Sequence, residues 1–340
     1  MRVGVYRGVR TIAVEDVPEP VAGPSDVVLE VRACGICGSD LHTYLEGALV
    51  QPGQVLGHEF SGEVVAAGSE VRGISLGDRV TGIPIQPCGD CRRCREGLGH
   101  LCERMHENGI GFGIPGAFAE RVRIPNATLG INAHLLPEEL SFEDGASVEP
   151  LAVAVHCVRR SGARAGQTAF VFGLGTIGLD VAQVLLAQGV SPVIGVDPSE
   201  LRRRTAEELG VAALAGPDLA AGVRDVLGER ELDHVFECAG LPALVQASLD
   251  LVRPRGTVTI VALYDEQATI DPMVLLHKEA TIVAGAMVTP EDFAESLELL
   301  RSGRAVGERL VTHRERLVDL PAAFELQCDK AATIKVMVSP

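Results

Sequence analysis

Residues 168–197 constrain the fold of this chain more than any other stretch. They open with an apolar run, 168–172, which is typical of a buried strand. Gly173, Gly175 and Gly178 follow as a G-x-G-x-x-G pattern, and a helical apolar period comes directly after them. Such a pattern between a strand and a helix indicates a dinucleotide-binding turn, because the glycines admit a pyrophosphate to the helix N-terminus.

An acidic residue lies at the distance that this kind of turn requires. Asp197 stands nineteen residues after Gly178 and directly follows a second apolar run, 193–196. Its carboxylate can accept hydrogen bonds from both adenosine ribose hydroxyls and would repel a 2′-phosphate, which favours NAD over NADP. The basic run 202–204 could tolerate a 2′-phosphate, so NADP stays an alternative. We expect instead that these residues form a solvated helix face from which one arginine, Arg202, stacks on the adenine. The predicted cofactor-binding residues are Gly173, Gly175, Thr176, Ile177, Gly178, Asp197 and Arg202.

The two parts of the chain differ in their pattern. After residue 197, apolar runs alternate with helical periods, which predicts a parallel, doubly wound sheet of the Rossmann type. Residues 1–124 instead contain short strands separated by glycine and proline, which predicts a β-rich domain that carries its functional groups on loops. A length of 340 residues also favours two domains. The predicted strands include 27–31, 59–68, 77–85, 117–124, 232–238, 257–263, 281–287 and 334–338, and the predicted helices include 242–252, 290–300 and 320–327.

A first candidate metal site lies in the stretch 34–59. Cys37, His58 and Glu59 offer a thiolate, an imidazole and a carboxylate, which are the ligands that catalytic zinc sites combine with one open position. Ser39 and His42 follow the thiol closely and could carry a proton.

Cys34 and Cys37 also form a C-x-x-C pair, for which a thioredoxin-like redox site is the alternative. We disfavour it because Gly35 and Gly38 should prevent a helix there and because His58 offers Cys37 a better partner. Cys34 is then a small buried residue.

A second candidate metal site lies in the loop CGDCRRCREGLGHLC. Cys88, Cys91, Cys94 and Cys102 have the spacing C-x2-C-x2-C-x7-C, which matches a closed, tetrahedral, structural zinc site. An iron–sulfur cluster is the alternative, but it usually carries a proline after the last cysteine or a second ligand set. Four thiolates leave the nearby His100 and His106 without a ligand role, so we expect them to be surface residues.

The stretch 141–160 has a helical apolar period. Ser141 and Asp144 resemble a capping box at its start. Glu149 stands near the start of the apolar part of this helix, where a carboxylate serves the helix dipole or reaches a metal. His156 and Cys157 are predicted packing residues.

Composition limits the partners. The formal charge of −16 argues against nucleic acid and anionic membranes. Nine cysteines without an apparent export signal read as metal ligands or buried thiols. No stretch approaches the length of a membrane span, and we expect a cytoplasmic location.

Taken together, the motifs CGICGSDLH, GHEFSGEV, the four-cysteine loop, SVEPLAVAVH, GLGTIG and VDPSE resemble the zinc-dependent medium-chain alcohol and polyol dehydrogenases along the whole chain. The resemblance implies a GroES-like catalytic domain at 1–149 and 289–340 and a Rossmann NAD-binding domain at 150–288. It implies two zinc ions per chain. Cys37, His58 and either Glu59 or Glu149 would hold the catalytic one.

The resemblance further implies hydride transfer between NAD and a small vicinal diol of the 2,3-butanediol and acetoin type. Ser39, His42 and Glu149 would be catalytic. A sorbitol or other polyol dehydrogenase and an L-threonine 3-dehydrogenase are the alternatives, and a non-catalytic NAD-binding protein is a remote one. We also expect a homo-oligomer, a dimer or tetramer, with 257–263 and 281–287 as candidate contact strands; a monomeric mass in solution would contradict this.

Overall fold

The computed structural model describes residues 1–216 and 219–340 and divides into two compact units. Unit 1 comprises Met1–Ala152, Met287–Asp329 and Lys335–Pro340. Unit 2 comprises Val153–Ala286 and Lys330–Ile334. The chain therefore leaves unit 1 once, returns to it, and contributes a five-residue segment to unit 2 just before its last strand.

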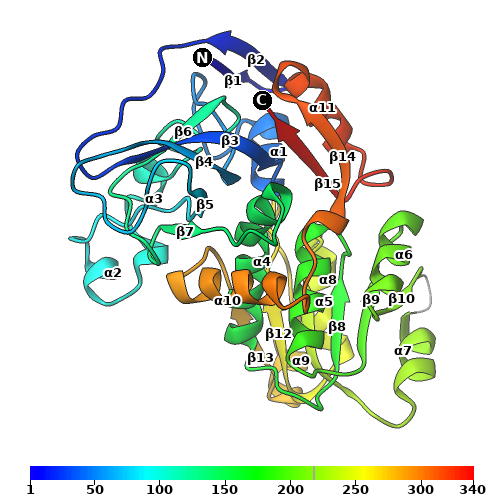
Figure 1. Cartoon of the computed structure of the whole chain (residues 1–340). Helices are drawn as coiled ribbons and strands as arrows, with labels where there is room; N and C mark the ends of the chain where they lie inside the picture. The colour runs from blue at the N-terminus through cyan, green and yellow to red at the C-terminus, as the bar shows by residue number, and fades with distance from the viewer. Residues whose placement is uncertain (217–218) are drawn as a thin grey trace. The chain divides into compact units, whose positions relative to one another are not determined.

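Unit 2 is built on a six-stranded parallel sheet with the order β10-β9-β8-β11-β12-β13 (Figure 1). Strand β8 lies inside the sheet, and all four of its residues are buried, as its apolar sequence predicts. Helices alternate with the strands along the chain, which confirms the predicted doubly wound α/β class. The strands are β8 (Ala169–Phe172), β9 (Val193–Val196), β10 (Ala212–Leu214), β11 (Leu232–Glu237), β12 (Val252–Ile260) and β13 (Thr281–Ala284), and the helices are α5 (Thr176–Ala187), α6 (Glu200–Glu208), α7 (Leu219–Leu227), α8 (Pro242–Leu251) and α9 (Pro272–Lys278).

Unit 1 is built on a seven-stranded sheet with the order β14-β15-β3-β4-β5-β7, and β6 also pairs with β3. All its pairs are antiparallel except β14 with β15. The two strands β1 and β2 form a separate antiparallel pair. The strands are β1 (Arg2–Gly8), β2 (Thr11–Asp16), β3 (Val27–Gly35), β4 (Glu59–Ala67), β5 (Arg79–Gly82), β6 (Arg121–Ile124), β7 (Ala133–Leu135), β14 (Val311–Arg316) and β15 (Lys335–Ser339).

The helices around this sheet are mostly short. Helix α4 begins in unit 1 and continues into unit 2. Its start confirms the predicted capping box, because Ser141 N donates to Asp144 Oδ2 (3.2 Å) and Asp144 N donates to Ser141 Oγ (3.0 Å). The helices are α1 (Gly38–Glu46), α2 (Arg92–Arg95), α3 (Met105–Asn108), α4 (Phe142–Ser161), α10 (Pro290–Arg301) and α11 (Leu320–Cys328).

The expectation that glycines prevent a helix after Cys37 is wrong. Helix α1 begins at Gly38, and Cys37 is its N-cap residue. Gly38 occupies the first helical position, where its amide would lack an intrahelical partner in any case, so it costs little there. The N–H of Cys37 donates to Asp40 Oδ2 (3.0 Å), which stabilises the helix start, and Gly47 ends the helix in the left-handed conformation.

Several predicted strands are shorter than their apolar patterns. The strand predicted at 77–85 extends only over Arg79–Gly82, because Gly77 has φ +85° and a turn precedes the strand. The strand predicted at 281–287 ends at Ala284. Strand β13 is also an edge of its sheet, and three of its four residues are exposed. Strand β12, by contrast, is paired on both sides, so of the two predicted contact strands only β13 offers a free edge, and the oligomer stays a prediction.

Within residues 1–216 and 219–340, no helix is long and apolar enough to cross a membrane.

Asp26 closes the junction between β3 and β6. Its carboxylate accepts hydrogen bonds from Gly23 N (3.1 Å), Asn126 N (3.1 Å) and Arg123 Nη1 (2.9 Å). Burial alone would raise the pKa of Asp26, but the two amides and the guanidinium together hold it below its usual value. The carboxylate therefore stabilises the fold in its ionised form.

We expect Asp26→Asn to lower the free energy of unfolding by about 1–3 kcal/mol at neutral pH. Because the folded-state pKa is lowered, this contribution is complete above the unfolded-state pKa of about 4 and is lost as the pH falls further. Urea unfolding between pH 3 and pH 7 measures it, with the exposed Asp16→Asn as control. If the difference in unfolding free energy between Asp26→Asn and the unmodified protein stayed constant down to pH 3, the ionised Asp26 carboxylate would not be the stabilising group.

Candidate functional site

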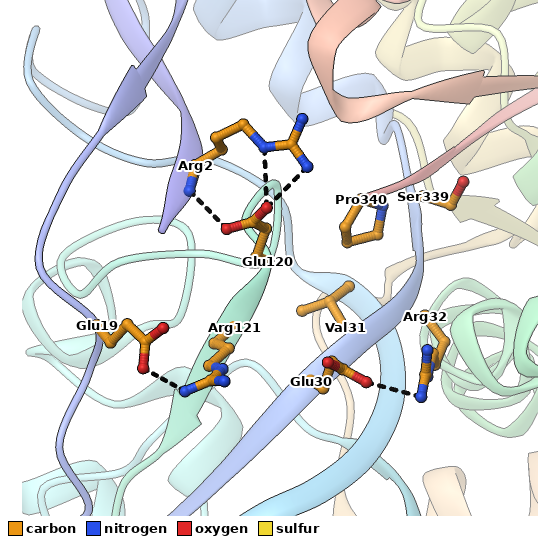
Figure 2. A pocket seen from close by; sticks show the side chains of 9 residues that line it. All are labelled: Arg2, Glu19, Glu30, Val31, Arg32, Glu120, Arg121, Ser339 and Pro340. Atoms are coloured by element: carbon orange, nitrogen blue, oxygen red, sulfur yellow. Dashed lines mark hydrogen bonds and ion pairs between the residues drawn. The ribbon is translucent and has the colours of Figure 1, made fainter.

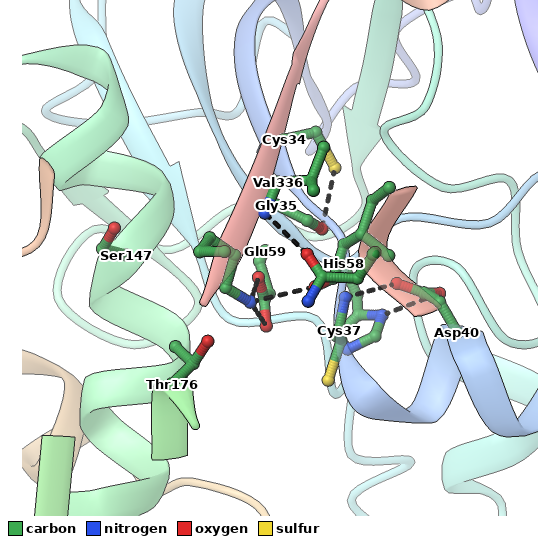
Figure 3. A network of polar contacts seen from close by, with 12 residues as sticks. Cys34, Gly35, Cys37, Asp40, His58, Glu59, Ser147, Thr176 and Val336 are labelled. Carbon is green, nitrogen blue, oxygen red and sulfur yellow. Dashed lines mark hydrogen bonds and ion pairs between the residues drawn. The ribbon is translucent and has the colours of Figure 1, made fainter. Parts of the chain in front are cut away.

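Sheet register brings the first candidate metal ligands together. Strands β3 and β4 pair so that Gly35 lies opposite Glu59. Cys37 follows Gly35 by two residues and His58 directly precedes Glu59, so all three side chains meet where the two strands end. One ligand atom from each of Cys37, His58 and Glu59 lies within 4.8 Å of the others (Figure 3).

A buried carboxylate, Asp40, lies beside the imidazole, and the sequence analysis missed it. Its Oδ1 lies 3.6 Å from His58 Nδ1, while its Oδ2 accepts from the N–H of Cys37. The other ring nitrogen, Nε2, lies 3.3 Å from Ser39 Oγ. His58 Nδ1 has no hydrogen-bond partner among the residues that the structure describes. Nδ1 of His58 thus faces the buried Asp40 carboxylate, and Nε2 faces the part of the site that contains Ser39. This orientation is typical of a metal-binding histidine.

The charges around His58 do not balance. Burial alone would lower the pKa of His58, but Asp40, Cys37 and Glu149 raise it well above its usual value. Burial also raises the pKa of Glu149 to about 7, and His58 opposes that rise. Glu149 has no hydrogen bond to its carboxylate within the part of the chain that the structure describes. A buried cluster with surplus negative charge and open acceptors fits a divalent cation.

Lys335 is the buried cation of this cluster, and sequence reasoning missed it too. Its Nζ donates to Glu59 Oε2 (2.6 Å), Glu59 Oε1 (2.8 Å) and the carbonyl of Ile36 (3.1 Å). Strand β15 reaches this place because Met337 pairs with Gly35. The available signal was a single lysine inside the apolar run 334–338.

An aromatic ring lies against the imidazole. The centroids of Phe112 and His58 are 4.9 Å apart, and the ring of His106 meets Phe112 edge-on at 6.3 Å. The loop that carries Phe112 packs closely on the backbone before His58, since a Cβ at Gly111 would lie 2.8 Å from the carbonyl oxygen of Gly57. The candidate centre therefore has an apolar wall beside its ligands.

Ser39 and His42 both lie on α1, three residues apart and hence on one face. Both are partly exposed, and His42 Nδ1 lies 3.8 Å from Glu46 Oε1. The helix thus places a hydroxyl beside the candidate ligand His58 and an imidazole one turn further on.

The four cysteines of the second candidate site form a compact cluster. Their sulfur atoms lie within 4.8 Å of one another. Backbone amides donate to them: Cys88 N to Cys102 Sγ, Cys91 N to Cys88 Sγ and Cys94 N to Cys91 Sγ, each at 3.4 Å. Amides of Glu103 and Cys94 lower the pKa of Cys91 to about 6, whereas the hydrogen bond with Asp90 raises the pKa of Cys88 to about 12 and burial raises that of Cys94. Four cysteine sulfurs clustered in this way fit a closed tetrathiolate metal site. Neither His100 nor His106 belongs to the cluster.

The glycine loop has the geometry that a dinucleotide requires. Gly173 has φ +83°, which turns the chain after β8. A Cβ at Gly178 would lie 1.8 Å from the carbonyl oxygen of Gly173, so helix α5 and the strand approach as closely as glycine permits. A Cβ at Gly175 would meet only the Arg202 guanidinium, at 3.6 Å and beyond, which leaves the backbone accessible to a phosphate.

Asp197 is buried at the end of β9 and faces this loop. Its Oδ2 accepts from Leu174 N (2.9 Å) and its Oδ1 from Ser199 N (2.8 Å), so the carboxylate ties the end of β9 to the glycine turn. Arg202 Nη1 lies 3.6 Å from Asp197 Oδ2. The same guanidinium donates to the carbonyl of Thr333 through Nε (3.0 Å) and Nη2 (2.9 Å), so contact with an adenine stays a prediction.

Ser199 and Thr176 hold the same returning segment, 330–334. Ser199 Oγ donates to the carbonyl of Ala331 (2.9 Å) and Thr176 Oγ1 to that of Ile334 (3.0 Å). Residues of the predicted cofactor motif thus anchor the chain directly before Lys335.

A separate charged cavity of about 370 Å³ lies in unit 1 where β6 and β15 both flank β3 (Figure 2). Its lining consists mainly of arginine–glutamate pairs: Arg2 with Glu120, Arg121 with Glu19 and Arg32 with Glu30. Because its cations are already paired and its lining contains neither cysteine nor histidine, it does not resemble the candidate metal centres.

Comparison with known proteins agrees with this geometry. The profile of the alcohol dehydrogenase GroES-like domain matches residues 23–133, and the profile of the zinc-binding dehydrogenases matches residues 176–302. The first match confirms the GroES-like prediction, and together the two profiles cover more than half of the chain.

Individual proteins match over nearly the whole length. The chain is 35% identical to (R,R)-butanediol dehydrogenase of Bacillus subtilis, with 100% of both chains covered. It is 30% identical to sorbitol dehydrogenase of the same species, over 100% of this chain and 97% of the relative. A crystal structure of 2R,3R-butanediol dehydrogenase from Bacillus subtilis superposes with a TM-score of 0.90 at 32% identity, covering 100% and 99% of the two chains.

These relatives are oxidoreductases, which supports an enzyme over the non-catalytic alternative. Butanediol and sorbitol dehydrogenases match at similar identity, so the comparison leaves the substrate open. The cysteine and histidine motifs fall in the first matched region, and the second matched region begins within the glycine motif, after Gly173 and Gly175. The chain belongs to the zinc-dependent medium-chain alcohol and polyol dehydrogenases.

Proposed function

We propose that the protein interconverts a small vicinal diol and its hydroxyketone with NAD, with 2,3-butanediol and acetoin as the preferred pair. The observation that carries this proposal is the meeting of Cys37, His58 and Glu59 within 4.8 Å, to which the buried Glu149 adds a carboxylate that helps to raise the pKa of His58. Sorbitol or another polyol and L-threonine remain the alternative substrates.

In this proposal Cys37 and His58 hold the catalytic zinc together with one of the two glutamates. When bound, the metal would supply Lewis acidity to the substrate oxygen and the nicotinamide would accept the hydride. Asp40 keeps Nε2 of His58 directed at the metal position through its contact with Nδ1.

Ser39 and His42 move the proton. Ser39 Oγ lies next to His58 and can exchange a proton with the reacting hydroxyl. His42, on the same face of α1, can pass it to solvent, because an imidazole can both accept and donate a proton.

The second hydroxyl of a diol requires a polar partner close to the first. A carboxylate that binds a metal through one oxygen keeps its other oxygen as an acceptor, and Glu149 is suited to this. The ring of Phe112 offers an apolar surface to a methyl group in the same region. Together these groups favour a short diol with apolar ends over a long polyol.

We expect kcat/KM for 2,3-butanediol to exceed that for 2-butanol at least about tenfold, because 2-butanol leaves a buried acceptor unpaired. Steady-state kinetics with 2,3-butanediol, 2-butanol, sorbitol and threonine on zinc-saturated protein measure this. Equal values for 2-butanol and the diol would refute the role of the second hydroxyl. A clear preference for sorbitol or threonine would overturn the substrate and leave the chemistry intact.

The two metal centres should differ in how readily they release zinc. We expect two zinc ions per chain, of which a chelator removes one together with activity, while the tetrathiolate ion stays bound. Cys94→Ser should lose the second ion and lower Tm by about 5 °C or more. Cys328→Ser, outside both clusters, is the matched control. Full activity with a single zinc per chain would contradict the assignment.

Asp197 should determine the choice of dinucleotide. Asp197→Ala is expected to lower kcat/KM for NAD about tenfold or more, since charged hydrogen bonds to the ribose are lost. If the substitution only damages the fold, kcat/KM should fall equally for NAD and NADP. If it removes ribose recognition, the ratio of kcat/KM for NAD to that for NADP should fall toward one. The exposed Asp225→Ala serves as control. Equal use of both dinucleotides by the unmodified protein would refute the role of Asp197.

A further inference from the structure

The last residues of three neighbouring strands in unit 2 lie side by side. Strand β11 pairs with β8 and with β12 so that Glu237 lies opposite both Phe172 and Ile260. Ligands of open parallel sheets bind beyond this carboxyl edge. In the proposed dinucleotide site, Asp197 follows β9 and the glycine turn follows β8. Because β11 lies on the other side of β8 from β9, a dinucleotide that crosses the turn carries its nicotinamide half to the ends of β11 and β12.

Glu237 is a fully buried carboxylate at this edge of the sheet. Its Oε1 accepts from Ala239 N and Gly240 N, each at 3.0 Å, and its Oε2 accepts from the phenol of Tyr264. Its backbone carbonyl accepts from the first amide after β12, Val261 N (3.0 Å). The main chain and the side chain of one residue thus bind both the loop after β11 and the loop after β12.

The loop after β11 also packs closely on its two neighbours. A Cβ at Gly240, where φ is +73°, would lie 2.5 Å from the carbonyl oxygen of Leu263 in the loop after β12. A Cβ at Gly173, in the glycine turn, would lie 3.0 Å from the Cβ of Ala239. The loops after β8, β11 and β12 are therefore packed against one another, so the position of one determines the space left for the next.

Tyr264 anchors the loop after β12. Residues 261–271 belong to no helix or strand, and Leu263 and 265–269 are exposed, whereas Tyr264 is half-buried. Burial raises the pKa of Tyr264 and Glu237 adds to the rise, so the phenol keeps its proton and can donate at working pH. Burial also raises the pKa of Glu237, and Tyr264 opposes that rise. A hydrogen bond to a carboxylate is stronger than one between neutral groups, so this contact is suited to hold an exposed loop.

We propose that Glu237 and Tyr264 are positioning residues for the nicotinamide half of the dinucleotide, because their hydrogen bond holds the loop after β12 in the conformation that receives the nicotinamide. Both act through the backbone of this loop. The inference rests on the dinucleotide site under "Proposed function" and extends it to the half that Asp197 does not bind. Without the hydrogen bond, the loop occupies the receiving conformation for only part of the time, and the apparent affinity falls by that fraction.

Two ligands separate the halves of the site without any turnover. NADH contains both halves, whereas ADP-ribose lacks the nicotinamide. Tyr264→Phe removes only the phenolic hydroxyl and should raise Kd for NADH about fivefold or more, because the loop is no longer held. Kd for ADP-ribose should stay within about twofold of the original, since the contacts of Asp197 lie outside the altered loop. Fluorescence titration with NADH and calorimetry with ADP-ribose measure the two constants.

Further variants separate positioning from loss of folding. Glu237→Gln keeps the shape of the side chain and can donate from its amide to the Tyr264 oxygen, so it should raise Kd for NADH less than Glu237→Ala does. Tyr44→Phe removes another phenol that donates to a glutamate, Glu325 (2.5 Å), but in unit 1, and should change neither constant. The emission maximum of bound NADH reports the surroundings of the nicotinamide and should shift in Tyr264→Phe but not in Tyr44→Phe.

The outcomes are distinguishable. An unchanged Kd for NADH in Tyr264→Phe would refute the role of the hydrogen bond. If Tyr264→Phe weakened NADH and ADP-ribose equally, the substitution would act on the whole site and the assignment to the nicotinamide half would be wrong. If the unmodified protein bound neither NADH nor ADP-ribose, the dinucleotide site under "Proposed function" would fail first.

Discussion

Unbalanced charge buried at the ends of β3, β4 and β15 is the constraint on which the rest of unit 1 depends. An imidazole and several carboxylates are buried there beside a partly buried thiol, and the one buried lysine forms its ion pair with Glu59. Burying carboxylates without enough positive charge destabilises the folded state, unless a further cation binds among them. The sheet must therefore hold these groups in one geometry, and a bound metal would return part of that cost.

The register of the strands supplies this geometry more reliably than the loops do. Gly35 lies opposite Glu59 on one side and Met337 on the other, so three segments distant in sequence end at one place. A slip of one residue would turn every side chain to the other face. Helix α1 then begins at the end of β3 and adds Asp40 to the inner side of the site. Catalytic precision in such a protein comes from backbone pairing as much as from the ligands themselves.

The nucleotide motif and the metal centre are linked along the chain. Arg202 and Thr176, which the sequence assigns to cofactor recognition, bind the backbone of 330–334, and so does Ser199. The next residue, Lys335, binds Glu59. A change in the hydrogen bonds that hold Ile334 would therefore act on the next residue, Lys335, and through its ion pair on the candidate metal ligand Glu59.

The sequence by itself determined the features that depend on local spacing. The glycines at 173, 175 and 178, the acid at 197 and the four clustered cysteines each require only a short stretch of chain, so their patterns are legible without a structure. The tertiary structure alone decided the roles of Asp40 and Lys335, the start of α1 after Cys37, and the contact of Arg202 with Thr333. Lys335 lies 276 residues from Glu59, and no local pattern encodes a pairing at that separation. Propensity also failed at Gly38, because capping by Asp40 and the packing of α1 outweigh the cost of a glycine at a helix start.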